Sequence, residues 1–203
     1  MKTVWVSGAS TGIGFATAKK FLNNNWKVII SSSNYEKLSL AKKKLLLKSK
    51  NKELHIYKCD ISDRNKVIET IKTIAKEIGS IDLAILNAAA YSPNKEQDFS
   101  IQNFEKLIDV NLKGTLFCIE SLINNMKNKL NHIAIVASPV GYRGLPTSAA
   151  YGLTKAGLIN LAESLFFDLK KEKIKISVIN PGFIESELTK LNSFPMPFLK
   201  SAD

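Results

Sequence analysis

A tyrosine and a lysine four positions apart are the first residues of this sequence that suggest chemistry. Tyr151 and Lys155 lie near the start of a predicted helix, where positions i and i+4 share one face. A phenol has an ordinary pKa of about 10 and is a poor proton donor or acceptor near neutral pH. A neighbouring ammonium group favours the phenolate and lowers that pKa, so the pair is a candidate acid–base catalyst. The same spacing also occurs between surface residues, and the pair needs support from other motifs.

A glycine-rich turn near the N-terminus is the second candidate. The segment SGASTGIG, residues 7–14, directly follows a predicted strand and directly precedes a predicted helix. Gly8 permits a tight turn, Gly12 lets the backbone approach a pyrophosphate, and Gly14 permits close packing of the helix. The N–H groups at the helix N-terminus favour an anion. The turn predicts a dinucleotide site, and the alternative is a strand-to-helix turn that binds no ligand.

The end of the second predicted strand bears on the choice between NAD and NADP. Recognition of the NAD ribose usually uses an acidic residue about 20 positions after the glycines. This chain instead has Ser31, Ser32, Ser33 and Asn34 there. Without a carboxylate to repel it, a 2′-phosphate could be bound by the serine hydroxyls, by backbone N–H groups and by Lys37. The sequence therefore favours NADP(H) over NAD(H), although the serines also suit a plain turn.

The elements that must position these residues alternate between strands and helices. The predicted strands are Thr3–Val6, Lys27–Ser31, Leu54–Cys59, Leu83–Leu86, Ile133–Ala137 and Lys175–Ile179. The predicted helices are Ile13–Asn24, Tyr35–Leu47, a helix capped by Ser62 and running to Ile78, Asn103–Asn128 and Tyr151–Lys170. Parallel strands need crossover connections, which are right-handed. The alternation therefore predicts one doubly wound α/β domain over residues 1–203, with a parallel sheet of about six strands and helices on both faces.

The charge of the chain is high but dispersed. The formal net charge is +11, yet only two of the 29 basic residues, Arg64 and Arg143, are arginine. The bidentate guanidinium groups that usually read phosphates and bases are almost absent, and spread lysines are usually a solvated surface. No nucleic-acid partner is expected.

Cysteine and histidine positions give no sign of a metal site. Cys59 and Cys118 have no neighbour at metal-ligand or CxxC spacing, and His55 and His132, interpreted as surface residues at strand edges, do not pair with them. The N-terminus reaches turn residues too soon for a signal peptide, and no apolar run approaches a membrane span. We expect no metal, no membrane partner and a cytoplasmic location.

In the order and spacing of its motifs, the sequence resembles the short-chain dehydrogenase/reductase family along residues 3 to about 188. The family's glycine motif matches Gly8, Gly12 and Gly14, and its YxxxK motif matches Tyr151 and Lys155. Single-residue matches are Asp60 after the third strand, Asn111 in a helix and Ser138 after the fifth strand. The Asn-Asn-Ala-Gly segment is matched loosely by residues 86–89, and the PGxxxT motif is matched by Pro181, Gly182 and Ser186.

The resemblance implies a Rossmann-fold NAD(P)-dependent oxidoreductase acting on a carbonyl or alcohol. Tyr151 would exchange a proton with the substrate oxygen, and Ser138 would hold that oxygen. Lys155 would bind the nicotinamide ribose and lower the pKa of Tyr151, while Asn111 would help to hold a water on a proton path. The expected cofactor contacts are Gly8, Ser10, Thr11, Gly12, Ile13, Gly14, Ser32, Ser33, Asp60, Ile61, Asn87, Ala88, Tyr151, Lys155, Pro181, Gly182, Ile184 and Ser186.

Some positions depart from the family pattern. Ala89 replaces a glycine and adds a Cβ where the backbone passes the cofactor, and Pro139 fixes the backbone after Ser138. Relatives usually continue through a further helix and a seventh strand, so the chain is expected to lack both, which leaves the sixth strand as an exposed edge. Residues 186–203 are expected to be an apolar C-terminal segment from a shortened substrate loop, without an obvious partner.

Two functions follow from these observations. The first is an NADP-preferring reductase or alcohol dehydrogenase, supported by the intact Ser138, Tyr151 and Lys155. The second is a shortened, catalytically weak nucleotide-binding or partner-binding protein of the same fold. The predicted helices Asn103–Asn128 and Tyr151–Lys170 resemble the pair through which the family forms dimers, which predicts a homodimer. Substrate choice would depend on residues 90–98, 139–148 and 183–199, which contain no recognisable anchor.

Overall fold

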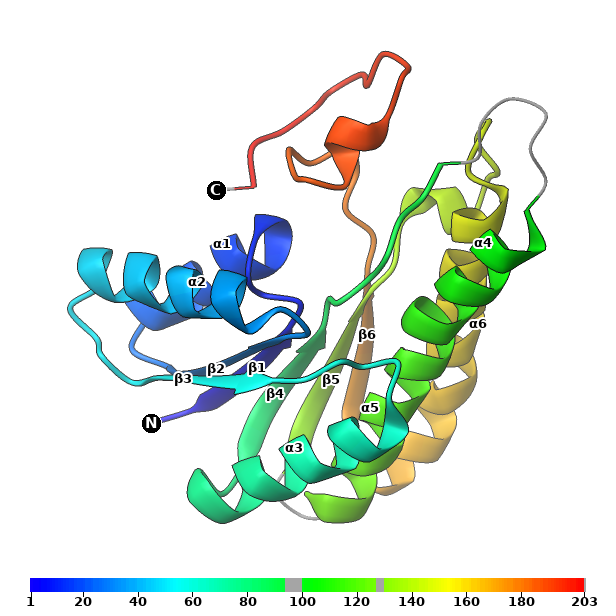
Figure 1. The fold of residues 1–203 in the computed structure, drawn as a ribbon. Coiled ribbons are helices and arrows are strands. Elements are labelled where there is room, and N and C mark those ends of the chain that lie inside the picture. The colour runs from blue at the N-terminus through cyan, green and yellow to red at the C-terminus, as the bar shows by residue number, and fades with distance from the viewer. Residues whose placement is uncertain (94–99, 127–129, 203) are drawn as a thin grey trace.

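Six parallel strands form one sheet in the order β3-β2-β1-β4-β5-β6 in the computed structural model, which describes residues 1–93, 100–126 and 130–202 (Figure 1). The strands are β1 (Thr3–Ser7), β2 (Lys27–Ser32), β3 (Leu54–Lys58), β4 (Ile81–Leu86), β5 (Leu130–Val136) and β6 (Lys175–Ile179). This topology confirms the prediction of a doubly wound α/β fold. β6 lies at one edge of the sheet, as expected.

The helices cover the sheet on both sides. They are α1 (Gly12–Asn23), α2 (Tyr35–Lys48), α3 (Arg64–Glu77), α4 (Ile101–Leu107), α5 (Gly114–Asn125) and α6 (Ala149–Lys171). In Figure 1, α1 and α2 lie on one face of the sheet, while α3, α5 and α6 lie on the other. Two buried apolar clusters fill the layers between the sheet and its helices.

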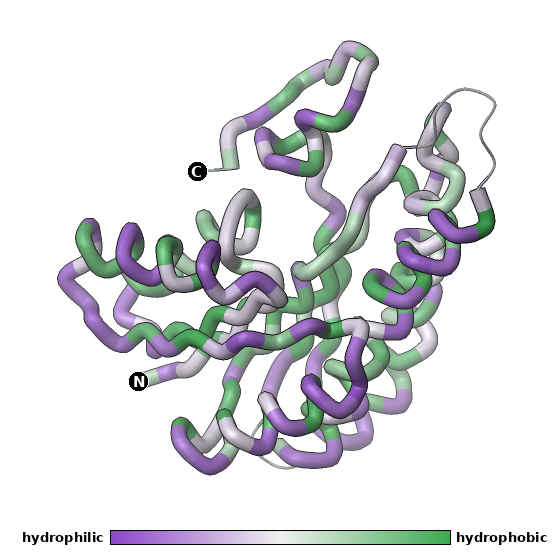
Figure 2. The backbone as a smooth tube through the Cα atoms, in the orientation of Figure 1, coloured by the Kyte–Doolittle hydropathy of each residue, from purple (hydrophilic) through white to green (hydrophobic). Residues whose placement is uncertain are grey.

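The central strands consist mostly of buried apolar residues because helices cover both faces of the sheet. All five residues of β1 are buried, and the single polar atom of the Trp5 indole donates to Ser31 Oγ at 3.0 Å. In Figure 2 the strands in the centre are largely green, whereas α2 and α3 alternate between green and purple turns. The lysines of α2 therefore form a solvated face, and its leucines Leu38 and Leu45 pack against the sheet.

Two local predictions are wrong. Asp63, not Ser62, caps α3: its carboxylate accepts from the N–H groups of Asn65 and Lys66 at 2.9 and 3.1 Å. Ser62 instead bonds to Asp60. His132 is not at a sheet edge, because β5 lies between β4 and β6, and its Nε2 is 2.7 Å from Ser177 Oγ on β6.

The predicted helix Asn103–Asn128 is divided. A π-helical segment, η1 (Ile108–Lys113), separates α4 from α5, and the expected end at Asn128 lies outside the described residues. A π-helical turn widens the backbone and commonly occurs at functional sites. Here it contains the fully buried Asn111.

The strand order reverses between β1 and β4, since β1 pairs with β2 on one side and with β4 on the other. In open α/β sheets, ligands bind beyond the carboxyl ends of the strands at such a switch point. The chain after β6 crosses this end of the sheet, toward α1 (Figure 1). Among the described helices, none has both the length and the apolarity that crossing a membrane requires.

Candidate active site

Two adjoining hollows lie at the carboxyl end of the sheet. The outer groove, of about 930 Å³, is lined by the glycine turn, the end of β2, the residues after β3 and β4, and Ser186. The inner cavity, of about 140 Å³, is lined by Ser138, Tyr151, Lys155 and the segment after β6. The hollows meet, because Ile13, Asn87 and Ser186 line both. An elongated ligand in the groove could therefore place one end beside Tyr151.

The glycine turn has backbone conformations that require glycine. Gly8 has a φ of +65°, and a Cβ there would lie 2.6 Å from Ala88 Cα. Gly12 has a φ of +56°, and its Cβ would lie 3.2 Å from Ser186 Cβ. The Thr11 side chain makes no capping bond to α1. The N-terminal N–H groups of α1 therefore face the groove without a side-chain cap, as an anion site requires.

Ser7 and Asn87 hold the turn against the end of β4. Ser7 Oγ accepts from the backbone N–H groups of Asn87 and Ala88 at 3.0 and 3.1 Å. The Asn87 amide donates in return to the carbonyls of Ser7 and Gly8, both at 3.1 Å. Four hydrogen bonds thus fix the floor of the groove on both sides of the switch point.

The far end of the groove carries the predicted phosphate-binding serines. Ser32 Oγ donates to Ser10 Oγ at 3.3 Å, and Ser33 is exposed. Asn34 caps α2 by accepting from the N–H of Lys37 at 2.9 Å. Lys37 lines the groove beside these residues. The structure therefore brings together hydroxyls, a helix N-terminus and an ammonium group.

Asp60 and Ile61 form the next part of the lining. The Asp60 carboxylate accepts from the N–H and the hydroxyl of Ser62 at 3.0 and 2.7 Å. Ile61 packs closely on Gly114 at the start of α5, where an added Cβ would lie 2.8 Å from Ile61 Cγ1. The loop after β3 is thereby held in place at the groove.

Ser138, Tyr151 and Lys155 line the inner cavity together. Ser138 caps the short 3-10 helix η2 (Pro139–Gly141), with its Oγ 3.4 Å from the N–H of Val140. Tyr151 and Lys155 share one face of α6, and the lysine Nζ is 5.4 Å from the centre of the tyrosine ring. That Nζ donates to the Val136 carbonyl at 2.8 Å.

Burial governs the protonation of the pair. Burial raises the pKa of Tyr151 to about 12, with a smaller contribution from Tyr91. Burial likewise lowers the pKa of Lys155 to about 8. In this arrangement the pKa of Tyr151 is raised and not lowered, because the apolar surroundings penalise the charged forms of both residues. Tyr151 is therefore a neutral phenol at pH 7, the form that donates a proton.

Asn111 lies beneath the site and lines neither hollow. Its Oδ1 accepts from the N–H of Ala90 at 2.8 Å, and its Nδ2 donates to the Ala90 carbonyl at 3.0 Å and to Thr154 Oγ1 at 3.1 Å. The Thr115 hydroxyl donates to the Asn111 carbonyl at 2.7 Å. The side chain therefore joins the chain after β4 to α6. Gly14 also lies outside both linings, packed under Asn87 and Gly8.

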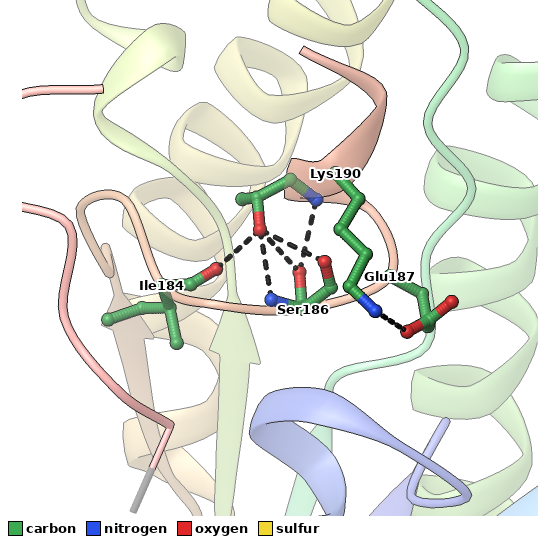
Figure 3. A network of polar contacts seen from close by, with 5 residues as sticks. Ile184, Ser186, Glu187 and Lys190 are labelled. Atoms are coloured by element: carbon green, nitrogen blue, oxygen red, sulfur yellow. Dashed lines mark hydrogen bonds and ion pairs between the residues drawn. The ribbon is translucent and has the colours of Figure 1, made fainter. Parts of the chain in front are cut away.

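The segment after β6 closes both hollows. Pro181, Gly182 and Ile184 line the inner cavity. The Thr189 hydroxyl donates to the Ile184 carbonyl at 2.8 Å and accepts from the N–H of Ser186 at 2.9 Å (Figure 3). An exposed ion pair between Glu187 and Lys190 spans the same turn.

The C-terminal segment has a partner within the chain. The Lys200 N–H donates to the Phe183 carbonyl at 2.9 Å, and the Glu185 N–H donates to the Lys200 carbonyl at 2.8 Å. Phe183 also contacts the Phe194 ring, with centroids 5.9 Å apart. The expectation of a tail without a partner is thus wrong for this part, although Phe198 is 89% exposed.

Sequence reasoning placed substrate choice in residues 90–98 and 183–199 but singled out neither Tyr91 nor Asn192, two polar residues of the inner cavity. They are hydrogen-bonded to each other, and the Tyr91 ring meets Tyr151 edge to face with centroids 4.9 Å apart. Tyr91 follows β4 at the carboxyl edge of the sheet, a position that could have signalled it. Nothing in the sequence marks Asn192. Among the described residues, no three histidine, cysteine, aspartate or glutamate side chains gather as a metal site would require.

The sequence of the whole chain is similar to that of known oxidoreductases. A family model described as short chain dehydrogenase matches residues 2–194. A 3-oxoacyl-[acyl-carrier-protein] reductase of Rickettsia typhi is 34% identical over 193 residues, which cover 94% of this chain and 76% of the relative. An uncharacterized oxidoreductase of Staphylococcus epidermidis is 28% identical over 194 residues, covering 95% of this chain and 82% of that protein.

Solved structures agree with the family match. ElxO with NADP bound is 28% identical and covers 99% of this chain and 86% of its own, with a TM-score of 0.89. Levodione reductase, at 24% identity and a TM-score of 0.88, covers 93% of this chain and 74% of its own and shows the shared fold.

Proposed function

The chain belongs to the short-chain dehydrogenase family, and from this premise we propose that it reduces a carbonyl substrate to an alcohol through Ser138, Tyr151 and Lys155. The observation that carries the proposal is the meeting of these three side chains in a cavity that opens into the outer groove.

The residues of the groove fit a nicotinamide dinucleotide. The glycines leave no Cβ where the backbone must approach a pyrophosphate, and the N-terminus of α1 supplies N–H donors. Ser10, Thr11 and Gly12 would hold the phosphates, Asp60 and Ile61 the adenosine end, and Asn87, Ile184 and Ser186 the nicotinamide end. When bound, the cofactor supplies the hydride.

The chain's own groups would bind the substrate and move the proton. The Ser138 hydroxyl would donate a hydrogen bond to the carbonyl oxygen and orient it. The Tyr151 phenol would then give its proton to that oxygen as the alcohol forms. Lys155 would turn from the Val136 carbonyl toward the tyrosine and a ribose hydroxyl, where its positive charge stabilises the phenolate left behind.

The test is turnover by the purified chain. We expect it to oxidise NADPH with at least one member of a panel of aldehydes, ketones and quinones. Tyr151→Phe should lose at least about 100-fold in rate, the usual contribution of a general acid. Tyr35→Phe, which removes an exposed phenol on α2, is the matched control. Cofactor binding without turnover would contradict the proposal and favour the nucleotide-binding alternative, and no binding would contradict both.

We further propose a preference for NADPH over NADH. Its support is the cluster of Ser10, Ser32, Ser33 and Lys37 at the far end of the groove, with no carboxylate on β2 to repel a 2′-phosphate. Lys37→Ala should weaken NADPH binding about tenfold, since an ion pair to phosphate is a charge-assisted bond. NADH binding should change little, and Lys44→Ala on the exposed face of α2 is the control. Equal losses for both dinucleotides in a fluorescence titration would refute the preference.

We also propose a homodimer formed through α4, α5 and α6. Ile101, Leu116 and Leu153 are exposed large apolar side chains on these helices. Light scattering should give twice the chain mass, and Leu153→Glu should give one chain mass. Leu47→Glu on α2 is the control, because Leu47 is exposed on a different face. A monomeric wild type would contradict the proposal.

For location, we propose the cytoplasm, in keeping with two buried cysteines that are free thiols.

A further inference from the structure

Tyr91 and Asn192 form a polar pair beside the proposed catalytic tyrosine. They lie 101 positions apart, and the Tyr91 hydroxyl donates to Asn192 Oδ1 at 2.6 Å. The Tyr91 ring packs edge to face on Tyr151, with centroids 4.9 Å apart. Both side chains are half-buried and line the inner cavity. The pair therefore lies within reach of a molecule bound at Tyr151.

The Asn192 amide makes a poor hydrogen bond in this arrangement. Its Nδ2 donates to Met196 Sδ at 3.2 Å. A thioether sulfur is a weak acceptor, and a primary amide has two N–H donors. A carbonyl or hydroxyl oxygen in the cavity would be a better acceptor for this amide. The site thus contains a hydrogen-bonding group that the chain itself does not use well.

The rest of the cavity restricts the ligand. Leu145, Phe183, Leu188 and Phe194 form apolar walls. Lys155 is the one charged side chain among the described residues of the lining, and it belongs to the reaction centre. A substrate carboxylate or phosphate would have no cation of its own to pair with and would lose its hydration. The cavity therefore suits an uncharged molecule with an apolar body.

From this geometry we propose that Tyr91 and Asn192 bind a second oxygen of the substrate, so that the enzyme takes small, uncharged diketones or hydroxyketones. The inference rests on the proposed carbonyl reduction. The carbonyl beside Ser138 and Tyr151 gains a hydride at carbon and a proton at oxygen. The second oxygen accepts a hydrogen bond from the Asn192 amide, or from the Tyr91 hydroxyl, and is left unchanged.

Steady-state kinetics with ring-matched probes test the proposal. The probes are cyclohexanone and the 1,2- and 1,4-cyclohexanediones, which differ in the second oxygen and its position. For each dione, the kcat/KM measured with Tyr151→Phe is subtracted and the remainder is divided by two, because a dione has two carbonyls. The corrected kcat/KM of at least one dione should exceed that of cyclohexanone by about tenfold. In Tyr91→Phe and in Asn192→Leu this ratio should fall toward one, and Tyr35→Phe should keep it. A wild-type ratio near one for every dione, or ratios unchanged in both variants, would overturn the proposal.

Binding separates this proposal from the proposed reaction. Calorimetric titration of the NADP⁺-loaded protein measures the Kd of each probe without turnover. The best dione should bind about tenfold more tightly than cyclohexanone, and Asn192→Leu should remove the difference. This result would support the binding of a second oxygen by Tyr91 and Asn192 even if no probe were reduced. A failure to reduce any probe would count against the proposed carbonyl reduction only. Equal Kd values for all three probes would reject the binding of a second oxygen by Tyr91 and Asn192, even in an active reductase.

Discussion

Replacing Lys155 by methionine should stabilise the fold while removing activity. Lys155 is 2% exposed, and burial lowers its pKa from 10.5 to about 8. One pKa unit corresponds to about 1.4 kcal/mol, so keeping the ammonium buried at pH 7 costs about 3 kcal/mol. Methionine has a similar length and no charge, but it loses the hydrogen bond to the Val136 carbonyl, worth about 1 kcal/mol. The net expectation is a gain of about 2 kcal/mol in the free energy of unfolding at pH 7.

The effect should depend on pH in a defined direction. Between pH 8 and pH 10.5 the unfolded chain keeps the Lys155 proton and the folded chain does not. The unfolded state therefore binds more protons, and the stability of the wild type rises with pH over this range. The methionine variant lacks this contribution. Its advantage should fall by about 2 kcal/mol between pH 7 and pH 10 and so nearly vanish.

Urea unfolding, followed by the fluorescence of the buried Trp5, measures both quantities. Lys44→Met, on the exposed face of α2, controls for the change of residue type and should show no such pH dependence. A Lys155→Met variant that is less stable than the wild type at pH 7 would refute the reasoning. So would an advantage that is the same at pH 7 and pH 10, because the buried charge would then not be its source.

Two further substitutions test how the site is held. Asn111→Leu should lower the free energy of unfolding by about 3 kcal/mol, because it removes the buried amide that bonds to the partly buried N–H and carbonyl of Ala90 and to Thr154; a loss below about 1 kcal/mol in urea unfolding would contradict the bridging role. Gly8→Ala should abolish NADPH binding in a fluorescence titration, since its Cβ would lie 2.6 Å from Ala88 Cα at a φ of +65°, whereas Gly144→Ala, with open space around it, should bind normally. Unchanged binding by Gly8→Ala would show that the turn can relax.

The local pattern of apolar and polar residues predicted much of the fold. The β-branched runs and the helical periods between them predicted all six strands and their parallel arrangement, and β6 has the predicted bounds. The prediction of the long helix failed at Asn111. Periodicity does not distinguish an α-helical turn from a π-helical one, and the difference arises here where a buried amide bonds to a neighbouring segment.

For the site, the sequence by itself determined the residue types and the end of the sheet where they meet. Two of these residues, Gly8 and Ser138, follow strands, and Tyr151 and Lys155 lie near the start of a helix. Right-handed crossovers bring all four to the carboxyl ends of the parallel strands. Only the tertiary structure decided the depth of burial. It raises the pKa of Tyr151 and lowers that of Lys155, contrary to what charge proximity alone predicts.

The pairing of Tyr91 with Asn192 also came from the tertiary structure alone. The two residues belong to segments whose paths depend on loop conformation, and no periodic pattern relates positions 101 apart. Strand and helix signals are local because backbone geometry repeats every two or 3.6 residues. Desolvation and long-range contacts have no such period, because they depend on how the whole chain packs around the site.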